Sequence, residues 1–244
     1  MPVVFITGGA RRIGRGLALR FASQGYDVGI TYHTSTREAS DVVGRISAAG
    51  VKAASVQCDV ADSAALEAAL VQMTTQIGLP DVIVSNAGVF PPRRTIHEIT
   101  MQDLDDTMSV NTKPLLTIAK TYVNMLESTD RTGRIISLSS LGAVEIWKDR
   151  IDYHVSKAAL VQLVKALARS LAPTISVNTV APGSIIFPDE GDEAGADLIS
   201  TSRIPMGRHG TADDIFDAIW FFATSSPYIT GQFLAVDGGY HLVR

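Results

Sequence analysis

Short runs of β-branched apolar residues alternate along this chain with longer segments in which apolar residues recur at helical spacing. Because consecutive parallel strands need a long crossover connection, this alternation predicts βαβ units and a parallel sheet covered by helices on both faces. The predicted strands are Val3–Ile6, Val28–Tyr32, Ala53–Gln57, Asp81–Val84, Arg134–Leu138, Ser176–Val180 and Phe233–Val236. The predicted helices are Arg12–Ser23, Thr36–Ala49, Ser63–Ile77, Met101–Leu126, Ile151–Leu171 and Thr211–Ala223.

Seven strands and six helices in this order predict an α/β fold, a single doubly wound (Rossmann) domain over residues 1–244. Its sheet is expected to have seven mostly parallel strands with helices on both faces. Pro114 lies inside the predicted helix Met101–Leu126 and is expected to kink it, because proline lacks the N–H that a helix interior needs. Ligands of such folds bind at the carboxyl ends of the strands, so candidate site residues are sought there.

The charge of the chain is nearly balanced, with 21 basic and 25 acidic residues spread along 244 positions. This pattern forms no basic face, so we expect a small-molecule substrate, no nucleic-acid partner and no membrane partner. The chain opens on MPVVFITGG with no basic leader, and no apolar run approaches the length of a membrane span. Cys58 is the only cysteine, which excludes an internal disulfide. A cytoplasmic protein is therefore expected.

A glycine-rich segment, Thr7 to Gly14, joins the first predicted strand directly to the first predicted helix. Glycines at such a turn let the backbone approach a pyrophosphate, and the helix N-terminus favours negative charge. The motif alone is weak evidence, because similar turns occur in α/β proteins that bind no nucleotide. We interpret it as a candidate dinucleotide site.

The end of the second strand discriminates between the two nicotinamide dinucleotides. NAD sites usually place an acidic residue there for the ribose 2′-hydroxyl, whereas this chain has Tyr32-His33-Thr34-Ser35 and no carboxylate before Glu38. A 2′-phosphate would meet hydroxyls, His33 and the loop residues Arg11 and Arg12. This favours NADP(H), with an ordinary solvated helix start as the alternative.

Two further segments follow predicted strands at the same edge of the sheet. Asp59-Val60 follows the third strand, and Asn86-Ala87-Gly88 follows the fourth. Both are candidates for cofactor contact. Simple turn chemistry is the alternative for each, since Asp, Asn and Gly favour turns whether or not a ligand binds.

Tyr153 and Lys157 lie four residues apart in a predicted helix, so their side chains share one face. A free tyrosine has a pKa of about 10. A cation about 4 Å away would lower that pKa by up to roughly three units at an effective dielectric constant near 20, which suits a general acid. Lys157 can also donate to the nicotinamide ribose. An exposed helix pair without function is the alternative.

Two polar residues strengthen the catalytic interpretation. Ser140 follows the fifth strand at the ligand edge, where its hydroxyl can hold a substrate oxygen. Asn111, inside the predicted fourth helix, can connect Lys157 to solvent through water, or be a buried amide with its hydrogen bonds satisfied. The five histidines are scattered and no cysteine cluster exists, so we expect no metal site. Cys58 is interpreted as a small buried residue.

The segment 187–197, FPDEGDEAGAD, is acidic and contains glycine. It follows the sixth predicted strand, beside the expected ligand site. A solvated loop and a lid over the substrate are the two interpretations of this segment.

Taken together, these motifs resemble the short-chain dehydrogenase/reductase family in order and spacing over nearly the whole chain. They are TGGARRIG, Asp59-Val60, Ser85 to Gly88, Asn111, Ser140, Tyr153 to Lys157, Ala181-Pro182-Gly183, Ile229 to Gln232 and Val236 to Gly239. The resemblance implies an NAD(P) fold, a frequent homotetramer and catalytic roles for Asn111, Ser140, Tyr153 and Lys157. The expected cofactor contacts are Gly8, Arg11, Arg12, Ile13, Gly14, His33, Thr34, Ser35, Asp59, Val60, Asn86, Ala87, Gly88, Tyr153, Lys157, Pro182, Gly183 and Ile185.

Arg12 stands where the family usually has a second glycine, and in this it resembles the pteridine and dihydromonapterin reductases, as does Tyr32-His33. Phe90 matches the position where those enzymes place an aromatic ring over the pterin, although the dihydromonapterin branch has Asp in place of Ser140. We therefore predict an NADPH-dependent pteridine reductase with Arg12, Phe90, Ser140 and Tyr153 at the substrate. The alternatives are a reductase of 3-oxoacyl thioesters or other carbonyls, and a non-catalytic NADPH sensor.

Overall fold

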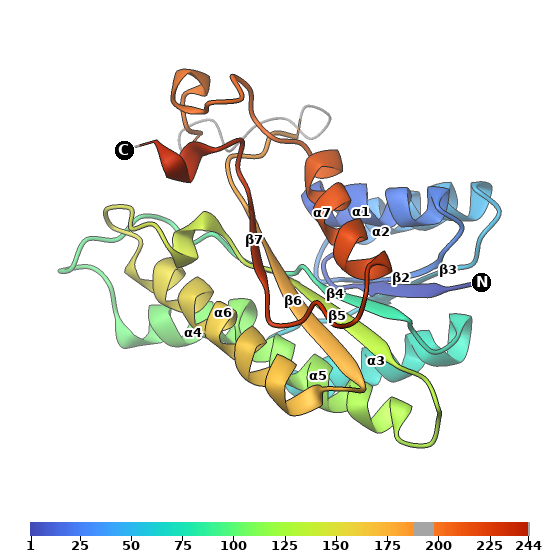
Figure 1. Cartoon of the computed structure of the whole chain (residues 1–244). Coiled ribbons are helices and arrows are strands. Elements are labelled where there is room, and N and C mark those ends of the chain that lie inside the picture. The colour runs from blue at the N-terminus through green and yellow to red at the C-terminus, as the bar shows by residue number, and fades with distance from the viewer. Residues whose placement is uncertain (188–197, 244) are drawn as a thin grey trace.

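The computed structural model describes residues 1–187 and 198–243 (Figure 1). Within them, seven strands form one sheet in the order β3-β2-β1-β4-β5-β6-β7. The strands are β1 Val3–Ile6, β2 Asp27–Tyr32, β3 Ala53–Gln57, β4 Val82–Ser85, β5 Gly133–Leu138, β6 Ile175–Pro182 and β7 Phe233–Val236. Every neighbouring pair is parallel, so the predicted doubly wound α/β fold is confirmed, and these strands are all rather than mostly parallel.

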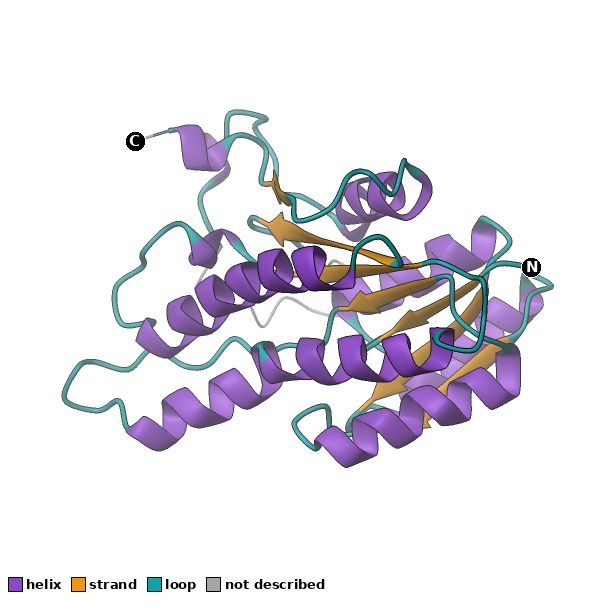
Figure 2. Cartoon of the chain, turned by 60° about the horizontal axis from the view of Figure 1, so that its bottom comes forward, coloured by secondary structure: helices purple, strands orange, loops and turns teal. Residues whose placement is uncertain are grey.

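Seven α-helices in the described ranges cover the two faces of this sheet (Figure 2). They are α1 Arg12–Ser23, α2 Thr36–Ala48, α3 Ser63–Ile77, α4 Met101–Asn111, α5 Lys113–Leu126, α6 Ile151–Leu171 and α7 Ala212–Thr224. In β1, Val4 and Ile6 pack in the core under α1 and α7, whereas Val3 and Phe5 pack in the core under α3 and α5. Successive strand residues point to opposite faces, so a strand covered on both sides is apolar throughout.

The predicted helix Met101–Leu126 is wrong as a single kinked helix, because the chain forms α4 and α5 instead. Thr112 separates them with φ −122° and ψ −54°, and Pro114 lies in the first turn of α5. A first-turn residue has no intrahelical partner for its N–H, so proline is well tolerated there and favours a new helix start. The other predicted elements agree with the structure to within two residues at either end.

The helices differ in how their N-termini are capped. Thr100 and Thr211 begin capping boxes with Asp103 and Asp214, and Asp62 accepts two backbone hydrogen bonds at the start of α3. The N-cap residue of α1, Arg11, makes no side-chain capping hydrogen bond, and the first turn of α1 has no acidic residue. The positive end of α1 is thus not neutralised by a carboxylate of its own first turn.

The sequence predicted that the chain has no membrane partner and that residues 187–197 form a loop or a lid. In the described part of the chain, no helix combines the length and apolar character that crossing a membrane requires. Residues 188–197 of the predicted loop or lid lie outside the described residues.

We predict that Tyr122→Phe lowers the free energy of unfolding by about 1 to 2 kcal/mol. The Tyr122 ring is completely buried, and its hydroxyl donates a 2.7 Å hydrogen bond to the carbonyl oxygen of Pro80, which the variant leaves without that donor. Denaturant unfolding measures the change. Tyr228→Phe, at a site 95% exposed, is the matched control and should change little; equal effects of the two substitutions would contradict the prediction.

Candidate active site

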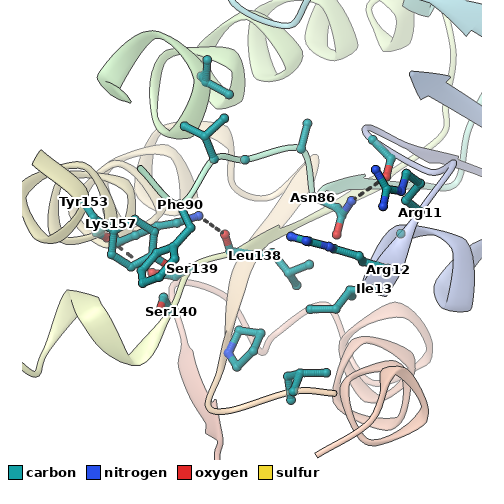
Figure 3. A pocket seen from close by; sticks show the side chains of 18 of the residues that line it. Arg11, Arg12, Ile13, Asn86, Phe90, Leu138, Ser139, Ser140, Tyr153 and Lys157 are labelled. Atoms are coloured by element: carbon teal, nitrogen blue, oxygen red, sulfur yellow. Dashed lines mark hydrogen bonds between the residues drawn. The ribbon is translucent and has the colours of Figure 1, made fainter. Parts of the chain in front are cut away.

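A cavity of about 1140 Å³ opens at the carboxyl ends of the strands. Segments that follow β1, β2, β3, β4, β5 and β6 all contribute to its wall. Figure 3 shows Arg11, Arg12, Ile13 and Asn86 at one end, and Phe90, Ser140, Tyr153 and Lys157 at the other. The fold thus brings the two groups of predicted site residues into one cavity.

The glycine-rich loop is tied to the end of β4. The Asn86 side-chain amide donates to the carbonyl oxygens of Thr7 and Gly8 at 2.8 and 3.0 Å. A Cβ at Gly14 would lie 2.1 Å from the Gly8 oxygen, so the first turn of α1 packs directly against the loop only with glycine at this position. Asn86 therefore holds the shape of the loop from within the cavity wall.

The donor groups at this end suit a phosphorylated dinucleotide. Arg11, Arg12 and His33 line the cavity close to the uncapped N-terminus of α1. Arg12 has φ +51°, a left-handed conformation that strains any residue other than glycine. Its guanidinium lies 5.9 Å from the centre of the Phe187 ring. Cationic side chains and helix N-terminal amides are the groups that bind phosphate, so these residues fit the cofactor.

At the other end, Tyr153 and Lys157 project from α6 toward Ser140 at the end of β5. Both α6 side chains are buried. The Lys157 ammonium donates to the Leu138 carbonyl oxygen at 3.0 Å, and its nitrogen lies 5.9 Å from the centre of the Tyr153 ring. The Ser140 hydroxyl accepts a hydrogen bond from the Gly142 amide at 3.1 Å, and its interaction with Tyr153 favours the ionised phenol. A substrate oxygen at this corner would lie beside two hydroxyl donors.

The protonation of this corner is governed by burial. Burial raises the pKa of Tyr153, while the Ser140 hydrogen bond and the charge of Arg150 lower it. Burial also lowers the pKa of Lys157 to about 8. The sequence predicted that Lys157 lowers the pKa of Tyr153, but the groups that lower it in the structure are Ser140 and Arg150, and burial outweighs both.

Asn111 lies next to the cavity and not in its described wall. Its side-chain oxygen accepts a hydrogen bond from the Val89 amide at 2.8 Å, and its nitrogen donates to the Val89 carbonyl oxygen and to the Ser156 hydroxyl. Of the two alternatives that the sequence left open for Asn111, this is the buried amide with its hydrogen bonds satisfied. Asn111 holds the segment after β4 in place, and its link to Lys157 stays a prediction.

Phe90 lines the cavity, and its predicted role at the substrate stays a prediction. Its ring meets Tyr153 edge-on at 4.7 Å, and the Arg150 guanidinium covers the ring at 4.0 Å from its centre. The sequence reasoning missed Arg150 and also Trp147, whose ring stacks at 6.2 Å from that of Tyr153. Their position just before the helix that contains Tyr153 was the available signal.

Most of the predicted site residues line the cavity, and a few do not. All predicted cofactor and substrate residues line the cavity except Thr34 and Ser35, which follow His33 away from it. Cys58 also lines it, and burial raises the pKa of its thiol to about 11, so it remains a protonated thiol near neutral pH. Among the described residues, no group of three or more His, Cys, Asp or Glu side chains is arranged to hold a metal.

Comparison with known proteins agrees with this geometry. A family model described as "Enoyl-(Acyl carrier protein) reductase" matches residues 8–241. A 3-oxoacyl-[acyl-carrier-protein] reductase, FabG of Staphylococcus aureus, is 36% identical in an alignment of 242 positions that covers 97% of each chain. A short-chain dehydrogenase of Burkholderia cenocepacia in complex with NADP is 34% identical, with a TM-score of 0.87 over 98% of each chain. Carveol dehydrogenase of Mycobacterium avium in complex with NAD is 27% identical, with a TM-score of 0.90 over 99% of this chain and 98% of that one.

The fold, the cavity and these matches define an oxidoreductase that uses a nicotinamide dinucleotide. The chain belongs to the short-chain dehydrogenase/reductase family. None of the three proteins named above is described as a pteridine reductase, so the more particular resemblance to that branch stays a prediction.

We predict that Lys157→Met stabilises the protein at about pH 6 by about 1 to 3 kcal/mol. The folded pKa of Lys157, about 8, lies below its ordinary value of 10.5, so burying the ammonium costs stability below about pH 8. That cost disappears as the pH rises from about 8 toward 10.5 and the folded lysine loses its proton.

Denaturant unfolding of both proteins at about pH 6 and about pH 10 measures this pH dependence, and the advantage of the variant should shrink at the higher pH. Lys165→Met changes an exposed lysine of the same helix and is the matched control. A variant that is less stable than wild type at the lower pH would show that the charge of Lys157 is compensated in the folded state.

Proposed function

We propose that this single-domain protein, residues 1–244, is an NADPH-dependent reductase of ketones, with 3-oxoacyl thioesters as the first candidate substrates. The observation that carries the proposal is one cavity with Ser140 and Tyr153 at one end and the arginine-bearing glycine loop at the other. A substrate carbonyl at the Ser140 corner and a dinucleotide on the loop would share this cavity.

The chain's own residues account for the protonation step. Ser140 donates to the substrate oxygen and orients the carbonyl next to Tyr153. Tyr153 gives its hydroxyl proton to that oxygen as the secondary alcohol forms. The bound NADPH supplies the hydride that adds to the carbonyl carbon. Lys157 lies on the same side of α6 as Tyr153 and is placed to orient the nicotinamide ribose. Asn111 keeps the segment after β4 in position.

NADPH is favoured over NADH by the residues around the loop. Arg11, Arg12 and His33 line the cavity where a 2′-phosphate would lie, and no carboxylate occupies residues 32–35. The strained backbone of Arg12 supports this assignment, since a glycine there would relieve the strain and lose the guanidinium. The relative that was solved with NADP supports the same choice.

Three observations favour a ketone over the predicted pterin. FabG of Staphylococcus aureus is named for the reduction of a 3-oxoacyl group, and the Mycobacterium avium relative is named as a carveol dehydrogenase. The Arg150 guanidinium covers one face of the Phe90 ring, which leaves a pterin only the other face for stacking. Ser140 is also the residue that departs from the dihydromonapterin branch. Pterin reduction is kept as an outcome of the test.

We further propose a homo-oligomer, a tetramer by family resemblance, in the cytoplasm. Leu116 on α5 and Phe221 on α7 are exposed apolar side chains on opposite faces of the sheet that such an assembly would cover.

We predict that the wild-type protein oxidises NADPH in the presence of a 3-oxoacyl thioester and that Tyr153→Phe lowers kcat by about a hundredfold or more. The variant keeps the ring and loses only the transferable proton, so its affinity for NADPH should be nearly unchanged. Steady-state kinetics and nucleotide fluorescence titration measure the two quantities, with Tyr228→Phe as the exposed control. Retention of more than about a tenth of wild-type turnover would exclude Tyr153 as the acid.

The same assay is run with acetoin-type ketones and with dihydropterins. Turnover of a dihydropterin without turnover of any ketone would overturn the ketone proposal in favour of a pteridine reductase.

We predict a higher kcat/KM with NADPH than with NADH, and a loss of about tenfold in that preference for Arg12→Gly. A charge-assisted hydrogen bond to phosphate is worth roughly 1.5 kcal/mol or more, and the glycine variant would lack it. Arg15→Ala, on α1 and absent from the cavity wall, should leave the preference unchanged. An equal or higher kcat/KM with NADH in the wild type would refute the assignment of NADP(H).

A further inference from the structure

Arg150 is a buried cation next to the candidate acid. It is the N-cap residue of α6, three positions before Tyr153, and its side chain is only 4% exposed. Its guanidinium lies over the Phe90 ring at 4.0 Å from the ring centre and donates a hydrogen bond to the Pro91 carbonyl oxygen. Arg150 thus joins the start of α6 to the segment that follows β4.

This contact determines where Phe90 lies. With one face under the guanidinium, the Phe90 ring turns its edge to Tyr153 at an interplanar angle of 85°. The cation, the ring and the phenol therefore form one packed column in the cavity wall. Phe90 is 47% exposed and Arg150 only 4%, so the ring contact contributes to the burial of the guanidinium.

We propose that Arg150 is a positioning residue for the reaction, which holds Phe90 against Tyr153 and stabilises the tyrosinate that remains after proton transfer. The inference rests on the proposed role of Tyr153 as the acid, and it adds a residue outside the predicted catalytic set of Asn111, Ser140, Tyr153 and Lys157.

The charge of Arg150 differs from that of Lys157 in its dependence on pH. Arginine side chains in proteins keep their charge, whereas burial lowers the pKa of Lys157 to about 8. Of the cations near Tyr153, Arg150 is the one whose charge lowers the tyrosine pKa against the effect of burial. A permanent cation keeps the tyrosinate accessible where Lys157 is losing its own charge.

Other charged or titratable groups lie on α6 or near the same cavity. From α6 they are Asp152, His154 and Lys157; from the other elements they are Arg93, Asp106, Glu145 and Arg203. Asp152 is paired with Arg94, and the His154 ring is held between Gly142 and Trp147. Arg93, Asp106 and Arg203 line the same cavity from exposed positions, where water screens their charges.

The test is the pH dependence of kcat/KM for alcohol oxidation with NADP⁺, in which Tyr153 must be ionised to accept the hydroxyl proton. In Arg150→Met the acid limb should move up by about one pH unit, because a buried opposite charge has been removed. The ultraviolet absorbance of tyrosinate, taken as the difference from the same protein with Tyr153→Phe, should shift in the same direction. Tyr122, whose pKa burial raises well above its ordinary value, does not interfere.

Two variants control for charge and for structure. Arg93→Met removes an exposed cation from the same cavity and should leave both titrations in place. Arg150→Lys keeps a cation, so both titrations should lie close to those of the wild type. If Arg150→Met does not fold, Arg150→Gln provides the same comparison.

An Arg150→Met enzyme with reduced kcat and an unmoved acid limb would overturn the proposal, because a merely structural role lowers activity without moving the tyrosine titration. The two proposals fail in different ways. Turnover that survives Tyr153→Phe refutes the proposed function. Loss of turnover in Tyr153→Phe, together with an unmoved limb in Arg150→Met, refutes the role of Arg150 alone.

Discussion

The pairing of β1 with β4 is the contact on which the site depends. At this point the strand order reverses, so the connections from β1 and β4 leave the sheet toward opposite faces and open a space between them. Thr7 and Asn86 close the bottom of that space: the Thr7 hydroxyl accepts hydrogen bonds from the amides of Asn86 and Ala87, and the Asn86 side chain returns two to the loop. These hydrogen bonds fix the position of the glycine loop relative to the segment after β4.

Burial then sets the chemistry at the catalytic end. Tyr153 and Lys157 are held in a wall with little water, which favours the neutral form of each and moves their pKa values in opposite directions. Burial therefore opposes the ionisation of Tyr153 and the protonation of Lys157. Such a corner suits proton transfer more than it suits stability, a compromise that is common in active sites.

The helix and strand pattern, the parallel sheet and the glycine loop could all be predicted from the sequence. Each depends on local spacing or on residue types that determine backbone shape, as with Gly14 against the Gly8 carbonyl. The break at Thr112 was missed because Pro114 is compatible both with a kink and with a first turn. The sequence left two roles open for Asn111 and could not name its partners, since Val89 and Ser156 are distant from it in the chain.

The sequence by itself determined the candidates for the proposed reaction, because Ser140, Tyr153 and Lys157 are defined by residue type, helical spacing and position at the end of a strand. Only the tertiary structure decided their environment. A pKa depends on solvent exclusion and on nearby charges, and Arg150 is the cation whose charge lowers the pKa of Tyr153. Spacing along one helix brings side chains to a common face, but the packing of the whole chain determines which of them remain in water.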